Sequence, residues 1–63
     1  MEYLVIYDPD GHTGAIWETY KTESQVLEVL NLYVSNPGFW CEVWHGKKVE
    51  LQRVQVCEKL IFK

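Results

Sequence analysis

The chain has 63 residues, of which 48% are hydrophobic and 14% aromatic. This length fits one small domain, residues 1–63, with a modest core, because such a chain buries only about 60% of the surface that it exposes when unfolded. The apolar content excludes a disordered tail. No apolar run reaches the roughly 20 residues needed to cross a bilayer, so we expect no membrane partner.

The net charge of −3 is unevenly distributed along the chain. Residues 1–40 hold one basic and six acidic residues, whereas residues 41–63 hold five basic and three acidic ones. This pattern is compatible with a bipolar surface and also with ordinary scatter over a fold whose ends meet. An acidic overall balance is not typical of dedicated nucleic-acid binders, which are usually strongly basic.

Residues 2–8 alternate in side-chain character and are rich in β-forming residues, which predicts a first strand. The segment Asp8-Pro9-Asp10-Gly11 predicts a turn, because proline presets φ and glycine accepts a positive φ. With a short bulged turn, the second strand covers about residues 14–21 and places Tyr3 opposite Trp17.

The segment Thr22-Glu23-Ser24-Gln25 matches the capping box that begins many helices, with Thr22 capping the amide of Gln25. Apolar residues then recur at helical spacing, and Ser35-Asn36-Pro37-Gly38 ends the pattern. We therefore predict one helix of about 12 residues, or three turns. Its apolar stripe contains Val26, Leu27, Val29, Leu30, Tyr33 and Val34.

Residues 39–45 and 49–56 predict a second hairpin around Gly46-Lys47-Lys48, with Val43 opposite Leu51. The alternation of apolar residues then shifts by one position, which predicts a bulge or break near Gln52 and Arg53. Residues 58–63 are compatible with a continued strand and with a short edge strand.

Together these elements predict an α+β domain of ββαββ order, with an antiparallel sheet of about four strands and one helix packed on one face. One helix cannot cover both faces, so the other face is left open. We expect the helix to pack on a mainly aliphatic set of residues, namely Leu4, Ile6, Ile16, Phe39, Cys41, Val43 and Leu51. On the open face we expect the large aromatic residues Tyr3, Tyr7, Trp17, Trp40 and Trp44.

An open aromatic face predicts a binding surface. Soluble monomers seldom expose large contiguous apolar patches, and Trp and Tyr are enriched among residues that dominate binding energy. Two alternatives stay open on the sequence alone. In one, the faces are reversed and the aromatic residues form the core. In the other, two copies of the chain bury the aromatic face against each other.

No group of residues predicts catalysis, a metal or a cofactor. Cys41 and His45 lie four residues apart on a predicted strand, roughly 13 Å, which is too far for a hydrogen bond or a shared zinc ion. Asp8 and Asp10 lack the further ligands of a calcium loop, so we interpret them as turn residues. We therefore expect that the chain is not an enzyme and has no cofactor.

The basic residues are the remaining feature of the C-terminal part. Lys47 and Lys48, at the predicted hairpin tip, could form a charged rim of the aromatic face or contact phosphates beside stacked bases. A charged tip that resists edge-to-edge aggregation is the structural alternative. The other members of this basic group are Arg53, Lys59 and Lys63.

Two classes of function follow, and we expect the first. The first is a small stand-alone interaction module that binds another protein through the five aromatic residues, with Lys47 and Lys48 at the rim. By analogy of size with chains encoded by phages and other mobile elements, such a module would inhibit a host enzyme or defence complex. The second is a single-stranded nucleic-acid-binding domain that uses the same aromatic residues and the basic C-terminal segment.

The expected location of the chain is cytoplasmic. Two cysteines, Cys41 and Cys57, are too few for a disulfide-stapled domain and fit a reducing compartment, in which each is a small buried apolar side chain. Residues 1–7 lack the basic segment of a secretion signal.

Overall fold

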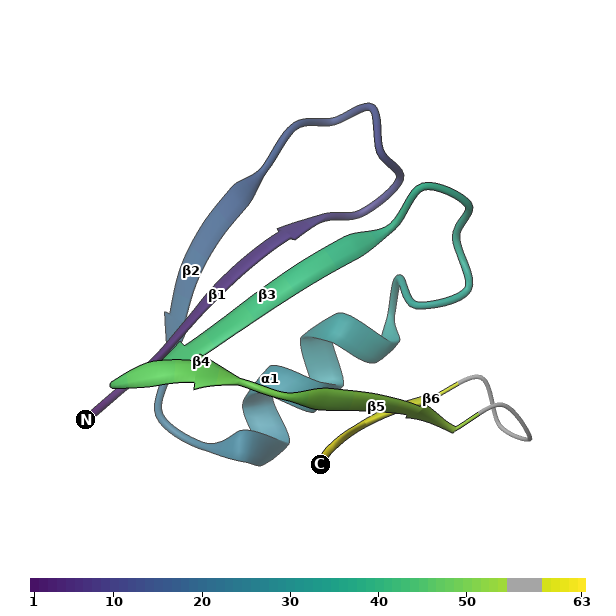
Figure 1. Ribbon diagram of the computed structural model, residues 1–63. Coiled ribbons are helices and arrows are strands. Elements are labelled where there is room, and N and C mark those ends of the chain that lie inside the picture. The colour runs from purple at the N-terminus through teal and green to yellow at the C-terminus, as the bar shows by residue number, and fades with distance from the viewer. Residues whose placement is uncertain (55–58) are drawn as a thin grey trace.

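The computed structural model describes residues 1–54 and 59–63 (Figure 1). Strands β1 to β4 form a four-stranded antiparallel sheet in the order β2-β1-β3-β4, and β5 and β6 form a second sheet of two strands. The predicted small α+β domain with a four-stranded antiparallel sheet and one helix is confirmed. The elements are β1 (Tyr3–Asp8), β2 (Ile16–Tyr20), α1 (Glu23–Asn31), β3 (Trp40–His45), β4 (Lys47–Val49), β5 (Leu51–Val54) and β6 (Lys59–Phe62).

Helix α1 begins at the predicted capping box. The amide of Gln25 donates to the Thr22 hydroxyl at 3.2 Å, and the Thr22 amide donates to the Gln25 side chain at 3.2 Å, so two amides of the helix start are satisfied. The helix is shorter than predicted because, after Asn31, the chain continues in tighter turns. There the amide of Tyr33 donates to the carbonyl of Leu30 at 3.1 Å.

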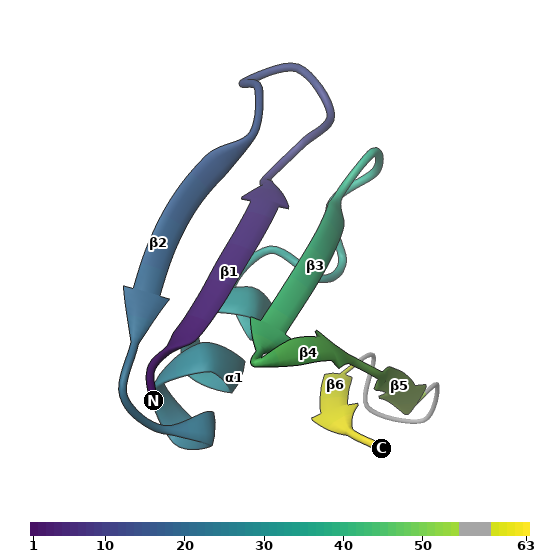
Figure 2. The ribbon, with the colours of Figure 1, turned by 60° about the vertical axis from the view of Figure 1, so that its left-hand side comes forward.

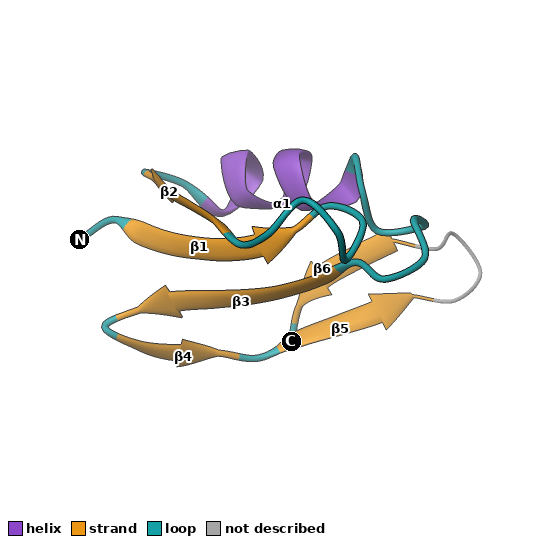
Figure 3. Cartoon of the chain, turned by 90° about the horizontal axis from the view of Figure 1, so that it is seen from above, coloured by secondary structure: helices purple, strands orange, loops and turns teal. Residues whose placement is uncertain are grey.

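Helix α1 packs on one side of the four-stranded sheet (Figure 2 and Figure 3). The predicted apolar stripe of the helix contributes to the core, since Val26 and Leu30 are fully buried. No helix among the described residues is long and apolar enough to span a membrane. The buried core cluster consists of Tyr3, Val5 and Tyr7 from β1, Val43 from β3, Leu60 from β6, and Val26, Leu30 and Val34.

The first hairpin has a longer loop than predicted, and its register differs by three residues. Two aspartates hold this loop by accepting backbone amides. The Asp8 carboxylate accepts from Gly11 at 2.8 Å and from Gly14 at 3.2 Å, and the Asp10 carboxylate accepts from His12 at 2.8 Å. Strand β2 therefore starts at residue 16, and the predicted pairing of Tyr3 with Trp17 is wrong.

This shift changes which face of β1 meets the helix. Trp17 pairs with Ile6, whereas Tyr3 pairs with Tyr20. Because side chains alternate along a strand, a shift by an odd number of residues exchanges the two faces. The prediction that Leu4 and Ile6 pack under the helix is therefore wrong, and the helix instead covers Tyr3, Val5 and Tyr7.

The second hairpin turns at Gly46, whose φ of 79° suits a residue without a side chain. Val43 pairs with Val49 rather than with Leu51, so this register differs from the predicted one by two residues. An even shift leaves the faces as predicted. Ile16, Phe39, Cys41 and Leu51 pack against the core, as expected.

The chain leaves the four-stranded sheet at Glu50, which belongs to no strand. The break predicted near Gln52 and Arg53 lies two residues earlier, at Glu50, because Gln52 and Arg53 are within β5 and pair with Ile61 and Leu60. The C-terminal strand β6 is tied to the helix by the Asn31 side chain. The Leu60 amide donates to the Asn31 carbonyl oxygen at 2.7 Å, and the Asn31 amide group donates to the Leu60 carbonyl at 3.3 Å.

Candidate functional site

The sheet face opposite α1 carries all three tryptophans of the chain. Strand pairing places Trp17 beside Ile6 and Trp44 beside Leu4 on this side. We call this surface the tryptophan face and define it as Leu4, Ile6, Trp17, Trp40 and Trp44. The predicted placement of the three tryptophans on the face without the helix is confirmed.

The tryptophan face is apolar and partly open to solvent. Trp17 is 65% exposed, Trp40 45% and Trp44 37%. Ile6, by contrast, is only 9% exposed although no helix covers it, because its cross-strand neighbours are Trp17 and Glu42. The sequence pattern predicts Leu4 and Ile6 for the core and therefore does not reveal the aliphatic centre of this surface.

Tyr3 and Tyr7 do not belong to the tryptophan face, and the prediction that they lie there is wrong. Tyr3 is 9% exposed and Tyr7 5%, and both are part of the core under α1. The Tyr3 ring stacks on His45 with 3.9 Å between centroids, and the Tyr7 ring stacks on Tyr33 with 5.7 Å. The three-residue shift in the first hairpin is the physical reason for this error.

The tyrosine hydroxyls under the helix converge on one carboxylate. Tyr7 donates to Glu18 at 3.0 Å, and Tyr20 donates to the same oxygen at 2.6 Å. Burial, with the nearby Glu18 carboxylate, raises the pKa of Tyr7 to about 12, and the same causes raise the pKa of Tyr20. Glu18 thus points inward from β2, an edge strand, and its charge is satisfied by two donors.

This cluster predicts a loss of stability at high pH. An unfolded tyrosine ionises near pH ~10. Because the folded pKa of Tyr7 is raised to about 12, the unfolded state releases its proton first as the pH rises. The free energy of unfolding should fall from pH ~10 upward and stop falling, for this group, above the folded pKa. Urea unfolding between pH 8 and 11.5 measures this, and Tyr7→Phe should give a shallower fall. Equal slopes for both proteins would contradict the assignment.

Glu42 introduces one charge into the tryptophan face. Trp40, Glu42 and Trp44 alternate along β3 and therefore share one side of the strand. The indole N–H of Trp44 donates to the Glu42 carboxylate at 2.9 Å. Glu42 is half-buried and lies opposite Ile6, toward the middle of the surface. The alternation Trp-x-Glu-x-Trp was the available sequence signal for this residue.

The two lysines predicted for the rim lie on different sides of β4. Lys48 pairs with Trp44 and so borders the tryptophan face. Lys47 pairs with His45 on the other side, so its predicted position at the rim of the tryptophan face is wrong. The reason is that neighbouring residues of a strand point in opposite directions.

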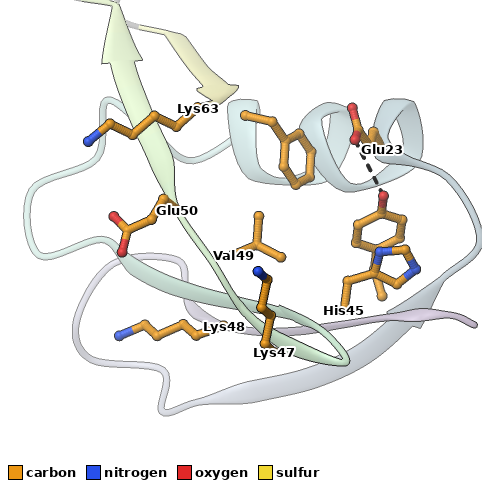
Figure 4. A pocket seen from close by; sticks show the side chains of 9 residues that line it. Glu23, His45, Lys47, Lys48, Val49, Glu50 and Lys63 are labelled. Carbon is orange, nitrogen blue, oxygen red and sulfur yellow. Dashed lines mark hydrogen bonds between the residues drawn. The ribbon is translucent and has the colours of Figure 1, made fainter.

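Lys47 instead lines a separate groove of about 420 Å³ between β4, β6 and the start of α1 (Figure 4). Figure 4 shows the Lys47 side chain extending past Val49, while the side chains of Lys48 and Glu50 extend away from Val49. The Tyr3 hydroxyl donates to Glu23 at 3.4 Å across this groove. The groove is lined by Tyr3, Glu23, His45, Lys47, Lys48, Val49, Glu50, Phe62 and Lys63.

The basic residues of the C-terminal part do not gather on the tryptophan face. Lys63 lines the groove. The Arg53 guanidinium donates to the Val34 carbonyl at 3.4 Å, near the end of the helix. Lys59 belongs to the second sheet. Of these C-terminal basic residues, Lys48 is therefore the one that strand register places beside the tryptophan face, opposite Trp44.

The cysteine and histidine residues considered for catalysis or metal binding make structural contacts where the structure describes them. Cys41 is half-buried, and burial raises the pKa of its thiol. His45 stacks on Tyr3, and its Nε2 lies 3.0 Å from the Met1 carbonyl. Within residues 1–54 and 59–63, no three His, Cys, Asp or Glu side chains are grouped for a metal ion. The prediction for Cys57 lies outside the described residues.

Comparison with known proteins adds no relative. No protein-family model matches the chain, and neither the curated proteins nor the solved structures contain a significant match. The geometry of the tryptophan face and the charges around it are therefore the basis for assigning a function.

Proposed function

We propose that this chain is a protein-interaction module that binds its partner through the tryptophan face. The observation that carries the proposal is the exposure of three tryptophans around Leu4 and Ile6, on the side of the sheet that α1 leaves open. The domain has its own core on the opposite side, so these tryptophans are not required to fill it. Large aromatic side chains are the residues that most often dominate binding energy.

The single-stranded nucleic-acid alternative is less well supported. Such proteins combine stacking rings with a groove of positive charge that follows the phosphates. Here the basic residues lie at the two edges of the surface, Lys48 opposite Trp44 and Lys21 after β2 on the side of Trp17, while the carboxylate of Glu42 lies between Trp40 and Trp44. A phosphate backbone crossing this surface would meet a negative charge near its middle.

Three narrower expectations stay predictions. They are that binding inhibits a host enzyme or defence complex, that the protein acts in the cytoplasm, and that it is not an enzyme.

A pull-down from a lysate of the source cells, treated with nuclease, tests the proposal. The double variant Trp40→Ala/Trp44→Ala should lose the captured protein while its far-UV circular dichroism stays that of the wild type. Leu32→Ala is the matched control, because Leu32 is 68% exposed at the end of α1, away from the tryptophan face. It should retain the captured protein. A partner retained by the double variant would refute the proposal, and a partner lost on nuclease treatment would favour nucleic-acid binding.

A further inference from the structure

The position of Glu42 restricts what can cover the tryptophan face. Its carboxylate is flanked along β3 by Trp40 and Trp44 and, within the described part of the chain, receives one hydrogen bond, from the Trp44 indole at 2.9 Å. An ionised carboxylate can accept about four hydrogen bonds. A purely apolar partner would remove water from this charge and leave most of its acceptor positions empty, which opposes binding. A suitable partner therefore brings a donor, and a cation fits best.

The other charges near this surface disfavour two occupants. Glu42 is on the surface, and Glu2 and Glu50 continue the alternation of β1 and β4 on the same side, as do the two basic residues Lys48 in β4 and Lys21 after β2. Asp8 is already used by the loop amides. Three acids against two bases leave this side with a net negative charge, which is a poor match for a second copy of the same face because two negative surfaces would meet. The same net charge is a poor match for phosphates.

A hollow of about 210 Å³ lies next to Glu42, where β3, β4 and β5 meet. It is lined by Cys41, Glu42, Val43, Lys48, Val49, Glu50 and Leu51. Among cations, an arginine side chain matches both the carboxylate of Glu42 and the indole rings that flank it. Its planar guanidinium pairs with a carboxylate through two hydrogen bonds, stacks on an indole ring, and is more weakly hydrated than an ammonium group.

Building on the function proposed above, we propose that the tryptophan face binds an arginine-bearing segment of a partner protein. The guanidinium pairs with the Glu42 carboxylate and stacks against a neighbouring indole ring, while apolar residues of the same segment cover Ile6 and Leu4. Trp44 holds the carboxylate in place through its indole hydrogen bond.

A random peptide library displayed on phage tests this inference with a defined probe. Selection is made on the wild type, on Glu42→Gln, and on Trp40→Ala/Trp44→Ala. Glu42→Gln keeps an acceptor for the Trp44 indole and removes only the charge. We expect peptides selected on the wild type to be enriched in arginine. The strongest of them is then synthesised with arginine and with citrulline, its neutral isostere.

The arginine peptide should bind the wild type at least about tenfold more tightly than the citrulline peptide. On Glu42→Gln the two peptides should bind within about twofold of each other, which isolates the charge pair. Selected peptides that need the tryptophans but show no arginine excess would overturn this inference and leave the proposed function intact. If no peptide depends on the tryptophans, both fail.

Two further measurements cover the other occupants. Sedimentation equilibrium of the wild type should show a monomer, and a dimer that Trp40→Ala/Trp44→Ala dissociates would overturn the inference in favour of a second copy. A fluorescent 20-nucleotide oligo-dT should not bind at physiological salt. Binding that requires the tryptophans and weakens steeply with salt would overturn the inference in favour of nucleic acid.

Discussion

Leu30→Ala should lower the free energy of unfolding by ~2–5 kcal/mol, the usual cost of truncating a buried leucine. Leu30 is fully buried between α1 and the sheet, in the same cluster as Val5, Val43 and Leu60. A domain of this length has a total stability of only roughly 3–9 kcal/mol. One substitution therefore removes a large part of it. Urea unfolding followed by far-UV circular dichroism measures the loss.

Leu32→Ala is the matched control for this prediction. The two leucines are two residues apart, but Leu32 is 68% exposed. Its truncation should change the free energy of unfolding by less than ~0.5 kcal/mol. Similar losses for both variants would show that the buried side of the helix is assigned incorrectly.

Gly38→Ala should be the other strongly destabilising substitution, with a loss on the order of 3 kcal/mol. Gly38 has a φ of +85°, which costs energy for a residue with a side chain. A Cβ atom there would also collide with the carbonyl oxygen of Asp10, which is backbone and cannot move aside alone. The loops at one end of the sheet meet at this point, where the Asn36 side chain donates to the Pro9 carbonyl at 3.2 Å.

Gly14→Ala separates backbone strain from this collision. Gly14 has a comparable φ of +96°, but a Cβ atom there would meet nothing within 4 Å. Its loss should be limited to the strain, ~1–2 kcal/mol. Urea unfolding of both variants measures the difference, and equal losses would show that the contact between the two loops contributes nothing to stability.

The helix was the most predictable element, because several signals agreed. The capping box gave its first residue, and the spacing of Val26, Leu30 and Val34 gave its buried side. The faces of β1 were harder to predict. Both of them are apolar, with Tyr3, Val5 and Tyr7 on one side and Leu4 and Ile6 on the other. Alternation predicts the strand but cannot decide which of two apolar sides meets the helix.

The length of each hairpin loop determines which face of its strands meets the helix. Turn residues alone do not predict that length. The two aspartates of the first loop each accept several backbone amides, which lengthens it by an odd number of residues and exchanges the faces of β1. The second hairpin shifted by an even number, so Trp40 and Trp44 were placed correctly. Glu18 lies on the helix side of β2, where its carboxylate accepts hydrogen bonds from the Tyr7 and Tyr20 hydroxyls.

The central claim is that the tryptophan face is the binding surface, and the indole N–H signals of the protein test it most directly. The chain has three tryptophans, and all three lie on this face, so their signals in a ¹H–¹⁵N correlation spectrum report on it alone. The protein captured in the pull-down is titrated into ¹⁵N-labelled chain. We predict that the Trp40 and Trp44 indole signals shift or broaden, while the amide signal of Leu32 stays unchanged. Indole signals that remain unchanged at saturation would contradict the claim.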